Sequence, residues 1–336
     1  MQTRFDGLLD LARLPYFEVR DGHLVLADAS LGPTVDVHTH LALSYILPAT
    51  VDLLARHDEV EHYLPKERAL DLDIYVNKNF SDADLSRLKR DLTFGALHSG
   101  GMRRTHTAPN LLREMAELGI RSSVLLPIEF PVLSNNAERW LKATAGDPGF
   151  VGFGSVHPLM PNVAKRLDQQ IALGARGIKF HPAVQLISPS HPKAMALYRL
   201  CAARKLTVLF HCGPVGIETA AGRKRSLVRV YEPAIAENPD VSFILGHSGA
   251  LQMEEALAFS KRYPNVWLEV SSQSVTNVGR ILDEAPQDRV LFGTDWPFYH
   301  QAIVLAKVYL ATESRPEARR RVLYDNAASL FGLPTP

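Results

Sequence analysis

The sequence predicts an α/β protein whose parallel strands close into a (β/α)8 barrel, the TIM-barrel fold, on three observations. Short apolar runs typical of strands alternate with segments of helical spacing over most of the chain. Strands separated by helices must pair in parallel, because each crossover returns the chain to the same end of the sheet. Eight such units follow residue 33, the number that closes a barrel. A doubly wound sheet would need a Gly-rich phosphate turn after an early strand, and none is present.

Size and composition are consistent with one domain over residues 1–336. This is a length that α/β barrels reach as a single domain, and 46% of the residues are hydrophobic. The 37 basic and 36 acidic residues give a net charge of +1, which favours neither nucleic acid nor an anionic membrane as partner. There is no disulfide framework, signal pattern or membrane-length apolar run. We therefore expect a cytoplasmic protein with a small-molecule substrate; a homo-oligomer is left open.

The first strong strand pattern ends in a His-x-His pair. Val35 and Val37 would lie on one face of this strand, and Asp36, His38 and His40 on the other. The two histidines therefore share a face, and their imidazoles can converge on one metal ion. A chain with 13 histidines can also contain such a pair by chance, so the later strands have to decide between the two interpretations.

The elements before and directly after this strand break the regular alternation. An Asp21-Gly22 turn between two apolar runs predicts a small hairpin over 19–26. Residues 41–106 are charge-rich, and Ser81 and Asp84 could cap a helix there. We expect 41–106 to be a mostly helical insertion after strand one that acts as a lid over one end of the barrel.

From residue 107 onward helices and strands alternate regularly. Glycines at 119, 146 and 174 end three of the helices. The strands are expected at 34–40, 123–127, 150–156, 176–181, 206–211, 241–247, 265–271 and 289–295. The helices are expected at 107–118, 135–145, 162–173, 192–205, 253–262, 275–284 and 301–311. A long basic connection follows the strand that ends at residue 211.

Polar residues recur at the carboxyl ends of these strands. They are His38, His40, Lys179, His181, His211, His247 and Asp295. In a barrel these ends form one ring, where the active sites of such barrels lie. Taken singly, His247 could be a core histidine, Asp295 a helix cap, and Lys179 a side chain that reaches solvent. Their distribution over strands one, four, five, six and eight instead predicts a metal site.

These motifs resemble the amidohydrolase superfamily, in the branch called amidohydrolase family 2. The similarity runs from residue 34 to the end, apart from the insertion, and is much more specific for the superfamily than for a substrate. The matching motifs are Asp36-Val-His-Thr-His40, Gly177-Ile-Lys-Phe-His-Pro182, Phe210-His211, Leu245-Gly-His247, Leu291-Phe-Gly-Thr-Asp-Trp-Pro297 and Asn326-Ala-Ala-Ser-Leu-Phe-Gly-Leu333.

The resemblance implies a role for each member of the ring. His38, His40 and His211 would be metal ligands. Asp295 would bind the metal and accept a proton from the attacking water. His247 is a ligand of a second metal in some relatives, and in others a free acid/base beside a single metal. Lys179 matches the position that is a carboxylated lysine bridging two ions in two-metal relatives.

The ligand types favour Zn²⁺, as one or two ions, although other divalent metals accept them too. We therefore expect a metal-dependent hydrolase, an amidohydrolase, that cleaves an amide, ester or lactone bond with Asp295 as general base. The alternative is a non-oxidative decarboxylase or hydratase of an aromatic or unsaturated acid, with one metal and His247 as proton donor. A barrel that only binds a ligand is a third alternative, and the complete ligand set argues against it.

Three further residues are candidates for binding the substrate. His181 lies two positions after the strand-four lysine and so on the same face. Arg223 and Arg225 belong to a basic loop that follows strand five at the active-site end. A solvated surface is the simpler explanation of that loop, but arginine is also suited to hold a substrate carboxylate or phosphate.

Overall fold

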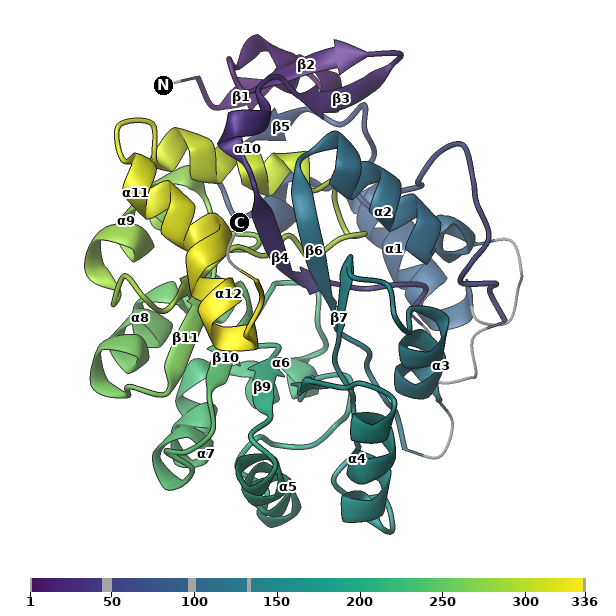
Figure 1. Cartoon of the computed structure of the whole chain (residues 1–336), viewed down its shortest axis with the longest axis vertical. Helices are drawn as coiled ribbons and strands as arrows, with labels where there is room; N and C mark the ends of the chain where they lie inside the picture. Colours follow the sequence, from purple (N-terminus) through teal and green to yellow (C-terminus); the bar gives the residue numbers. More distant parts are fainter. Residues whose placement is uncertain (1, 44–49, 96–100, 132–133, 335–336) are drawn as a thin grey trace.

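Eight parallel strands form the centre of the molecule, which confirms the predicted barrel (Figure 1). The structure is a computed structural model that describes residues 2–43, 50–95, 101–131 and 134–334. The barrel strands are β4 (Thr34–Thr39), β6 (Ile120–Leu125), β7 (Phe150–Gly152), β8 (Gly177–Phe180), β9 (Thr207–Phe210), β10 (Phe243–Leu245), β11 (Val266–Glu269) and β12 (Val290–Leu291).

Backbone hydrogen bonds join two groups of strands, β4-β6-β7 and β8 to β12, into one ring. Between β7 and β8, the Lys179 amide donates to the Gly154 carbonyl at 2.8 Å. Between β12 and β4, the Asp295 amide donates to the His38 carbonyl at 2.7 Å. This second contact brings the His-x-His strand and the Asp295 loop together at the carboxyl end of the barrel.

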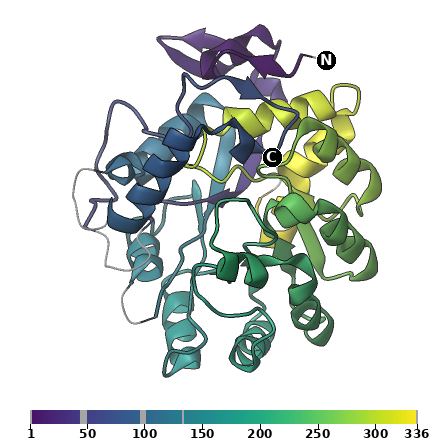
Figure 2. The same ribbon diagram turned by 180° about the vertical axis from the view of Figure 1, so that it is seen from behind.

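Helices surround the strands, as Figure 1 shows from one side and Figure 2 from behind. The α-helices outside the insertion are α2 (Ala108–Glu117), α3 (Asn136–Ala143), α4 (Val163–Ala172), α5 (Pro192–Ala203), α6 (Ala220–Ser226), α7 (Glu232–Glu237), α8 (Met253–Arg262), α9 (Val275–Glu284), α10 (Ala302–Ala311), α11 (Pro316–Arg320) and α12 (Asn326–Phe331). The shorter helical turns are η1 (Leu8–Arg13), η2 (Ala29–Leu31), η6 (Val228–Tyr231), η7 (Gly246–Gln252) and the π-helix η8 (Arg321–Asp325). None of the helices in the described ranges has the length and apolar character that a membrane crossing requires.

A separate apolar cluster fills the inside of the barrel. Its strand members come from all around the ring, and the C-terminal segment closes it with Tyr324, Ala327 and Phe331. Val35 and Val37 belong to this cluster, although strand alternation would place them opposite the two histidines. The pairing of β4 with β6 shifts register between Asp36 and Thr39, and this irregularity lets His38 and His40 also line the barrel mouth.

The N-terminal segment forms two small antiparallel pairs at one edge of the barrel (Figure 1). β2 (Phe17–Arg20) and β3 (His23–Leu26) form the predicted hairpin. Asp21 and Gly22 both have positive φ, 51° and 80°, which is the backbone of a type I′ turn. β1 (Arg4–Phe5) pairs with β5 (Leu70–Asp71), a short strand of the insertion.

The expectation of a mostly helical insertion is wrong for the part of 41–106 that the structure describes. It contains one α-helix, α1 (Asp82–Phe94), and two short turns, η3 (Val76–Asn79) and η5 (Met102–Thr105). Parts of its backbone bond to the barrel loops rather than within the segment. The Leu64 amide donates to the Phe298 carbonyl at 2.8 Å, and the Val76 amide donates to the Ser272 carbonyl at 2.9 Å.

A buried polar cluster fixes this irregular chain to the barrel. The Glu114 carboxylate of α2 accepts from the Trp296 indole N–H at 2.8 Å and lies 3.0 Å from His62 Nε2. His300 lies on the other side of the same carboxylate, at 3.9 Å. The insertion, α2 and the loop after β12 therefore meet at one acid.

Candidate metal centre

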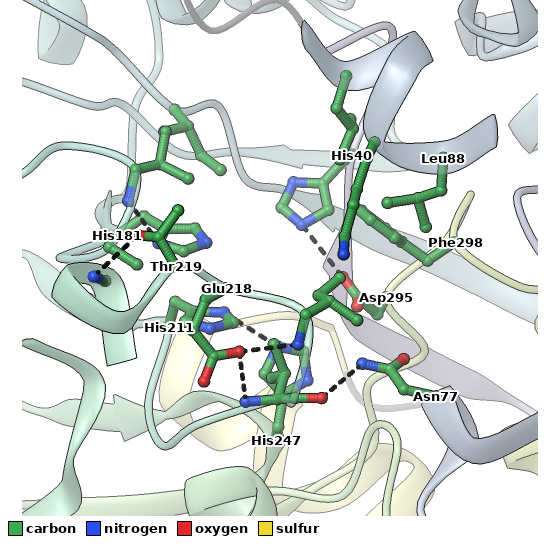
Figure 3. Close-up of a pocket in the computed structure, with 18 of the residues that line it drawn as sticks. His40, Asn77, Leu88, His181, His211, Glu218, Thr219, His247, Asp295 and Phe298 are labelled. Atoms are coloured by element: carbon green, nitrogen blue, oxygen red, sulfur yellow. Dashed lines mark hydrogen bonds and ion pairs between the residues drawn. The ribbon is translucent and has the colours of Figure 1, made fainter. Parts of the chain in front are cut away.

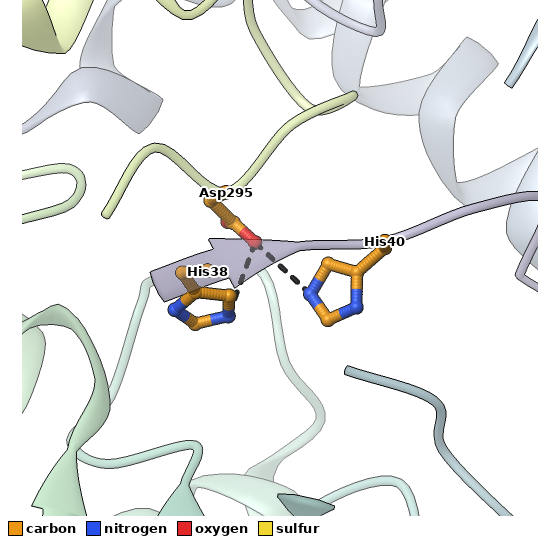
Figure 4. A group of neighbouring side chains, drawn as sticks. All are labelled: His38, His40 and Asp295. Carbon is orange, nitrogen blue, oxygen red and sulfur yellow. Dashed lines mark ion pairs between the residues drawn. The ribbon is translucent and has the colours of Figure 1, made fainter. Parts of the chain in front are cut away.

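Three side chains at the barrel mouth converge on one point (Figure 4). Asp295 Oδ1 lies 3.5 Å from His38 Nε2 and 3.3 Å from His40 Nε2. All three ligand atoms lie within 4.8 Å of one another. Asp295 adopts positive φ, 66°, a conformation that aspartate tolerates better than most residues. The end of β4 and the loop after β12 thus supply a compact group of two imidazoles and one carboxylate.

The other ring nitrogen of each histidine is held by an acceptor. His38 Nδ1 lies 2.7 Å from Glu269 Oε1, and His40 Nδ1 lies 2.7 Å from the Leu126 carbonyl oxygen. The carbonyl and the carboxylate accept a proton, so each Nδ1 carries the hydrogen and each Nε2 keeps its lone pair. Both histidines are therefore oriented as metal ligands by their outer contacts.

Burial sets the charge of the group. It lowers the pKa of His38 far below its ordinary value and that of His40 to about 3, with the neighbouring Lys179 ammonium as the next cause for both. Both imidazoles are therefore neutral at pH 7, the form that binds metals. Burial raises the pKa of Asp295, and Lys179 partly opposes that change.

The spacing fits a tetrahedral metal ion. Ligand atoms at 2.0–2.1 Å from Zn²⁺ in tetrahedral geometry are about 3.3–3.4 Å apart. The two separations that involve Asp295 Oδ1 are 3.5 and 3.3 Å. Imidazole nitrogen and carboxylate oxygen are also among the donors that zinc and neighbouring divalent ions accept. The residues present therefore fit such an ion.

Lys179 lies against this group from β8. Its Nζ is 3.1 Å from His38 Nε2, and its side chain is buried. Burial lowers the pKa of Lys179 to about 8, although the Asp295 and Glu269 charges oppose this. The amine donates to the nitrogen lone pair that a metal would need.

The remaining histidines of the ring form a second row. His181 and His211 stack with ring centroids 3.9 Å apart and planes 8° apart. His211 Nδ1 lies 3.3 Å from His247 Nε2. None of the three belongs to the group made by His38, His40 and Asp295. The structure thus brings all seven residues to one mouth. His247 also stacks on His38, with ring centroids 4.8 Å apart, and forms a second possible ligand group with His38 and Glu269.

A cavity of about 310 Å³ opens over these residues (Figure 3). Leu88, Lys89, Leu92 and Thr93 of α1 line it on the insertion side. Its other lining residues include the apolar Ile128, Ala183, Val184, Val215, Ile217 and Phe298, and the polar Tyr75, Asn77, Glu218 and Thr219.

Comparison with known proteins places the chain in a family. The family model Amidohydro_2, described as Amidohydrolase, matches residues 35–333. The chain belongs to this family. No curated protein matches the chain.

Several solved structures share the fold of this amidohydrolase-family chain. One is a dihydroxybenzoic acid decarboxylase from Polaromonas with bound manganese and 2-nitroresorcinol, at 15% identity and TM-score 0.57, covering 90% of this chain and 98% of that chain. Another is an amidohydrolase from Burkholderia multivorans with bound zinc, at 15% identity and TM-score 0.57, covering 90% and 100%. A third is a probable 2-pyrone-4,6-dicarboxylic acid hydrolase from Acinetobacter baumannii with bound citric acid, at 14% identity and TM-score 0.55, covering 90% and 100%.

The structure does not bring two of the expected substrate-binding residues to the cavity of this amidohydrolase-family protein. Arg223 is exposed, and the Arg225 guanidinium donates to the Ala221 carbonyl of its own helix at 2.9 Å. Their segment folds as α6, and of this helix only Gly222 lines the cavity, next to the capping residue Thr219. The helix directs both arginines away, whereas the sequence pattern suggested a loop.

Two buried acids near the site were assigned no role from the sequence. Glu269 ends β11 and contacts His38; its position at the end of a barrel strand is the signal that could have found it. Asp36 accepts from the His38 and Thr294 amides at 3.0 Å each, and from the Gln301 side chain at 2.6 Å. It thereby ties the first strand to the loop after the last one. Burial raises the pKa of Asp36 to about 7.

Gly293, in the expected last strand, has a specific packing role. A Cβ at this position would collide with Glu269 and His38. Glycine therefore allows these two side chains to approach each other beside the Asp295 loop.

Proposed function

We propose that this protein is a metal-dependent hydrolase that cleaves an amide, ester or lactone bond of a small molecule. The observation that carries the proposal is that the two oxygens of the Asp295 carboxylate have different surroundings. Oδ1 faces both His38 Nε2 and His40 Nε2. Among the described residues no hydrogen bond engages Oδ2, so this oxygen is available to accept a proton.

His38, His40 and Asp295 would hold the ion, and Zn²⁺ is the metal that we propose. A bound zinc ion lowers the pKa of its water from 15.7 to about 7 and polarises a carbonyl group. Glu269 and the Leu126 carbonyl keep the two imidazoles in the tautomer that leaves Nε2 unprotonated.

Asp295 would act as the general base. A carboxylate at this position can take up a proton from the attacking water and pass it to the leaving group. Its side chain is 14% exposed and lines the cavity, which gives a substrate access to the free oxygen. His247 would be the second acid/base group.

The insertion would shape the pocket and exclude water. Leu88 and Leu92 of α1 give this wall an apolar surface, and Lys89 adds a cationic group without an ion pair to any described residue. We therefore propose that 41–106 acts as a lid within a single catalytic domain. Lys89, rather than Arg223 or Arg225, is then the candidate to contact an acidic group of the substrate.

Decarboxylation of an aromatic acid is the second candidate. It is favoured by the apolar cavity walls and by His247, whose Nε2 faces His211 at the mouth and could deliver a proton to a ring carbon once protonated. Among the three structures of similar fold, the Polaromonas protein is named a decarboxylase, and the other two are named an amidohydrolase and a probable hydrolase.

One experiment separates these functions. The purified protein is analysed for metal, stripped with a chelator and reloaded with Zn²⁺ or Mn²⁺. It is then given a panel of lactones, esters and amides and a panel of aromatic acids. We expect hydrolysis that disappears on stripping and returns with metal. The His38→Ala variant should lose the metal, whereas His57→Ala, a control outside the cavity, should keep it.

The products decide between the candidates. Release of CO₂ from an aromatic acid without hydrolysis of any lactone, ester or amide would replace the hydrolase by the decarboxylase. Activity that survives complete metal removal would contradict both.

A further inference from the structure

We propose that Ser271 is a positioning residue that holds His247 in the Nδ1–H tautomer, so that the Nε2 lone pair faces the cavity. The residues that set this tautomer lie behind the site, on the segment that follows β11. The inference rests on the proposed function only for the use of His247 as an acid/base. The tautomer itself is a property of the protein without substrate or metal.

The argument begins at the Glu269 carboxylate, which is fully buried. Its Oε1 receives the His247 backbone N–H and lies 2.7 Å from His38 Nδ1 and 2.7 Å from Ser271 Oγ. Its Oε2 accepts from the Ser271 amide at 2.8 Å. A carboxylate surrounded by donors in this way acts as an acceptor toward each of them.

Ser271 therefore donates its single hydroxyl proton to Glu269 Oε1. Ser271 Oγ also lies 2.7 Å from His247 Nδ1. Because its proton is already used, the serine oxygen can only accept in this second contact. His247 Nδ1 must then carry the hydrogen, and Nε2 is left unprotonated.

The contact on the other side of the ring agrees with this assignment. His247 Nε2 lies 3.3 Å from His211 Nδ1. With its lone pair on Nε2, His247 accepts there and His211 Nδ1 donates. Together the two contacts are those of a neutral ring, with a hydrogen on Nδ1 and a lone pair on Nε2.

The backbone around His247 is shaped to keep the ring in place. His247, Ser248, Gly249 and Ala250 all have positive φ, between 45° and 77°, an unusual run for residues that carry a side chain. Gln273 Nε2 donates to the His247 and Ala250 carbonyls at 2.7 and 2.9 Å. This backbone conformation costs free energy that the rest of the fold must offset, which indicates that the orientation of His247 matters.

One carboxylate oxygen therefore fixes two tautomers, that of His38 directly and that of His247 through Ser271. In this arrangement His247 begins as a proton acceptor at Nε2 and can donate only after it has been protonated. Ser271 touches neither the cavity nor the converging ligand atoms, so its role is exerted through His247.

Nitrogen NMR of the protein stripped of metal tests the proposal directly. Protonated and unprotonated imidazole nitrogens have well-separated ¹⁵N shifts, and the His247 signals are identified by their loss in His247→Gln. We expect Nδ1–H in the wild type and a mixture of tautomers in Ser271→Ala. Ser272→Ala is the matched control, because Ser272 Oγ lies 3.4 Å from the same nitrogen and also contacts Tyr299. It should leave the tautomer unchanged.

Zinc binding separates the roles of Ser271 and Glu269. Ser271→Ala should leave Zn²⁺ affinity unchanged, whereas Glu269→Gln should lower it by about 10–100-fold, as is typical for the outer partner of a ligand histidine. An Nε2–H tautomer in the wild type, a measurement that needs no folded variant, would overturn the proposal. So would a Ser271→Ala spectrum that matches the wild type. Neither result depends on whether the protein proves to be a hydrolase.

Discussion

Asp295 is the residue on which the proposed hydrolysis depends most. Replacing it with Asn retains its volume but removes the charge and the proton acceptor. We predict that turnover by the metal-loaded enzyme falls by roughly 10²–10⁴-fold, the range for losing a general base. The measurement is kcat, normalised to the metal content of each sample so that lost metal is not mistaken for lost base.

The matched control is Asp288→Asn, which changes an exposed aspartate outside the cavity. It should leave turnover unchanged. Near-normal turnover in a metal-loaded Asp295→Asn enzyme would show that another group takes the proton.

For single residues, the sequence identified those whose type and position at a strand end suggest a metal ligand. It did not identify the residues that hold these ligands in place. His38, His40 and Asp295 are visible because two imidazoles and a carboxylate end separate strands. Ser271 carries no such signal, since serine is common and its role depends on a contact with His247 that is 24 residues distant along the chain. Roles exerted through a neighbour are therefore unreadable before the fold is known.

Among the elements, α1 both begins at a capping motif that the sequence shows and lines the cavity. Ser81 caps this helix, and the Asp84 carboxylate accepts a hydrogen bond from the Ser81 amide at 2.9 Å. Ser81→Ala should cost the helix about 1 kcal/mol, which corresponds to roughly fivefold faster amide exchange along α1. Hydrogen-exchange mass spectrometry of the α1 peptides measures this.

Ser86→Ala is the control, because Ser86 is an exposed residue in the middle of the same helix. Alanine is a better helix former there, so exchange should be unchanged or slower. Equal exchange in Ser81→Ala and wild type would show that packing against the barrel, rather than the cap, holds α1 over the cavity.

The other elements show why local signals succeed in the barrel and fail in the insertion. The predicted helices at 253–262 and 275–284 coincide with α8 and α9, because apolar spacing and their ends are local properties. The insertion was expected to be mostly helical from its charged composition. Its backbone instead bonds to distant barrel loops, as at Leu64 and Val76, and no pattern within the segment encodes those partners.

For the molecule as a whole, strand count predicted the closed barrel, and closure explains why the site residues meet. The contacts between the Asp295 loop and β4 join positions more than 250 residues apart. The sequence did not predict that the C-terminal segment closes the apolar cluster inside the barrel, although this segment carries one of the family-like motifs. Tyr324, Ala327 and Phe331 are apolar or aromatic at helical spacing, and such spacing does not say which face of a barrel they cover.

The number of metal ions per chain is a property of the whole assembly of strands, and it depends on Lys179. Its Nζ donates to His38 Nε2 at 3.1 Å. In the second possible ligand group, made by His38, His247 and Glu269, the His38 Nδ1 atom is already hydrogen-bonded to Glu269 Oε1 at 2.7 Å. We therefore expect one metal per chain, with and without bicarbonate, and an unmodified lysine beside it.

Lys179→Met tests this expectation, because an unmodified lysine and a carbamate predict opposite changes in Zn²⁺ affinity. An ammonium near the ion competes for the His38 lone pair and repels the metal, and a like charge about 4 Å away costs about 4 kcal/mol at an effective dielectric constant of 20. Methionine keeps the stem and removes the charge, so by this estimate Zn²⁺ should bind more tightly by up to about 10³-fold. A carbamate on Lys179 predicts the reverse. Two metals per chain in bicarbonate, falling to one or none in the variant, would show that the lysine is itself a ligand.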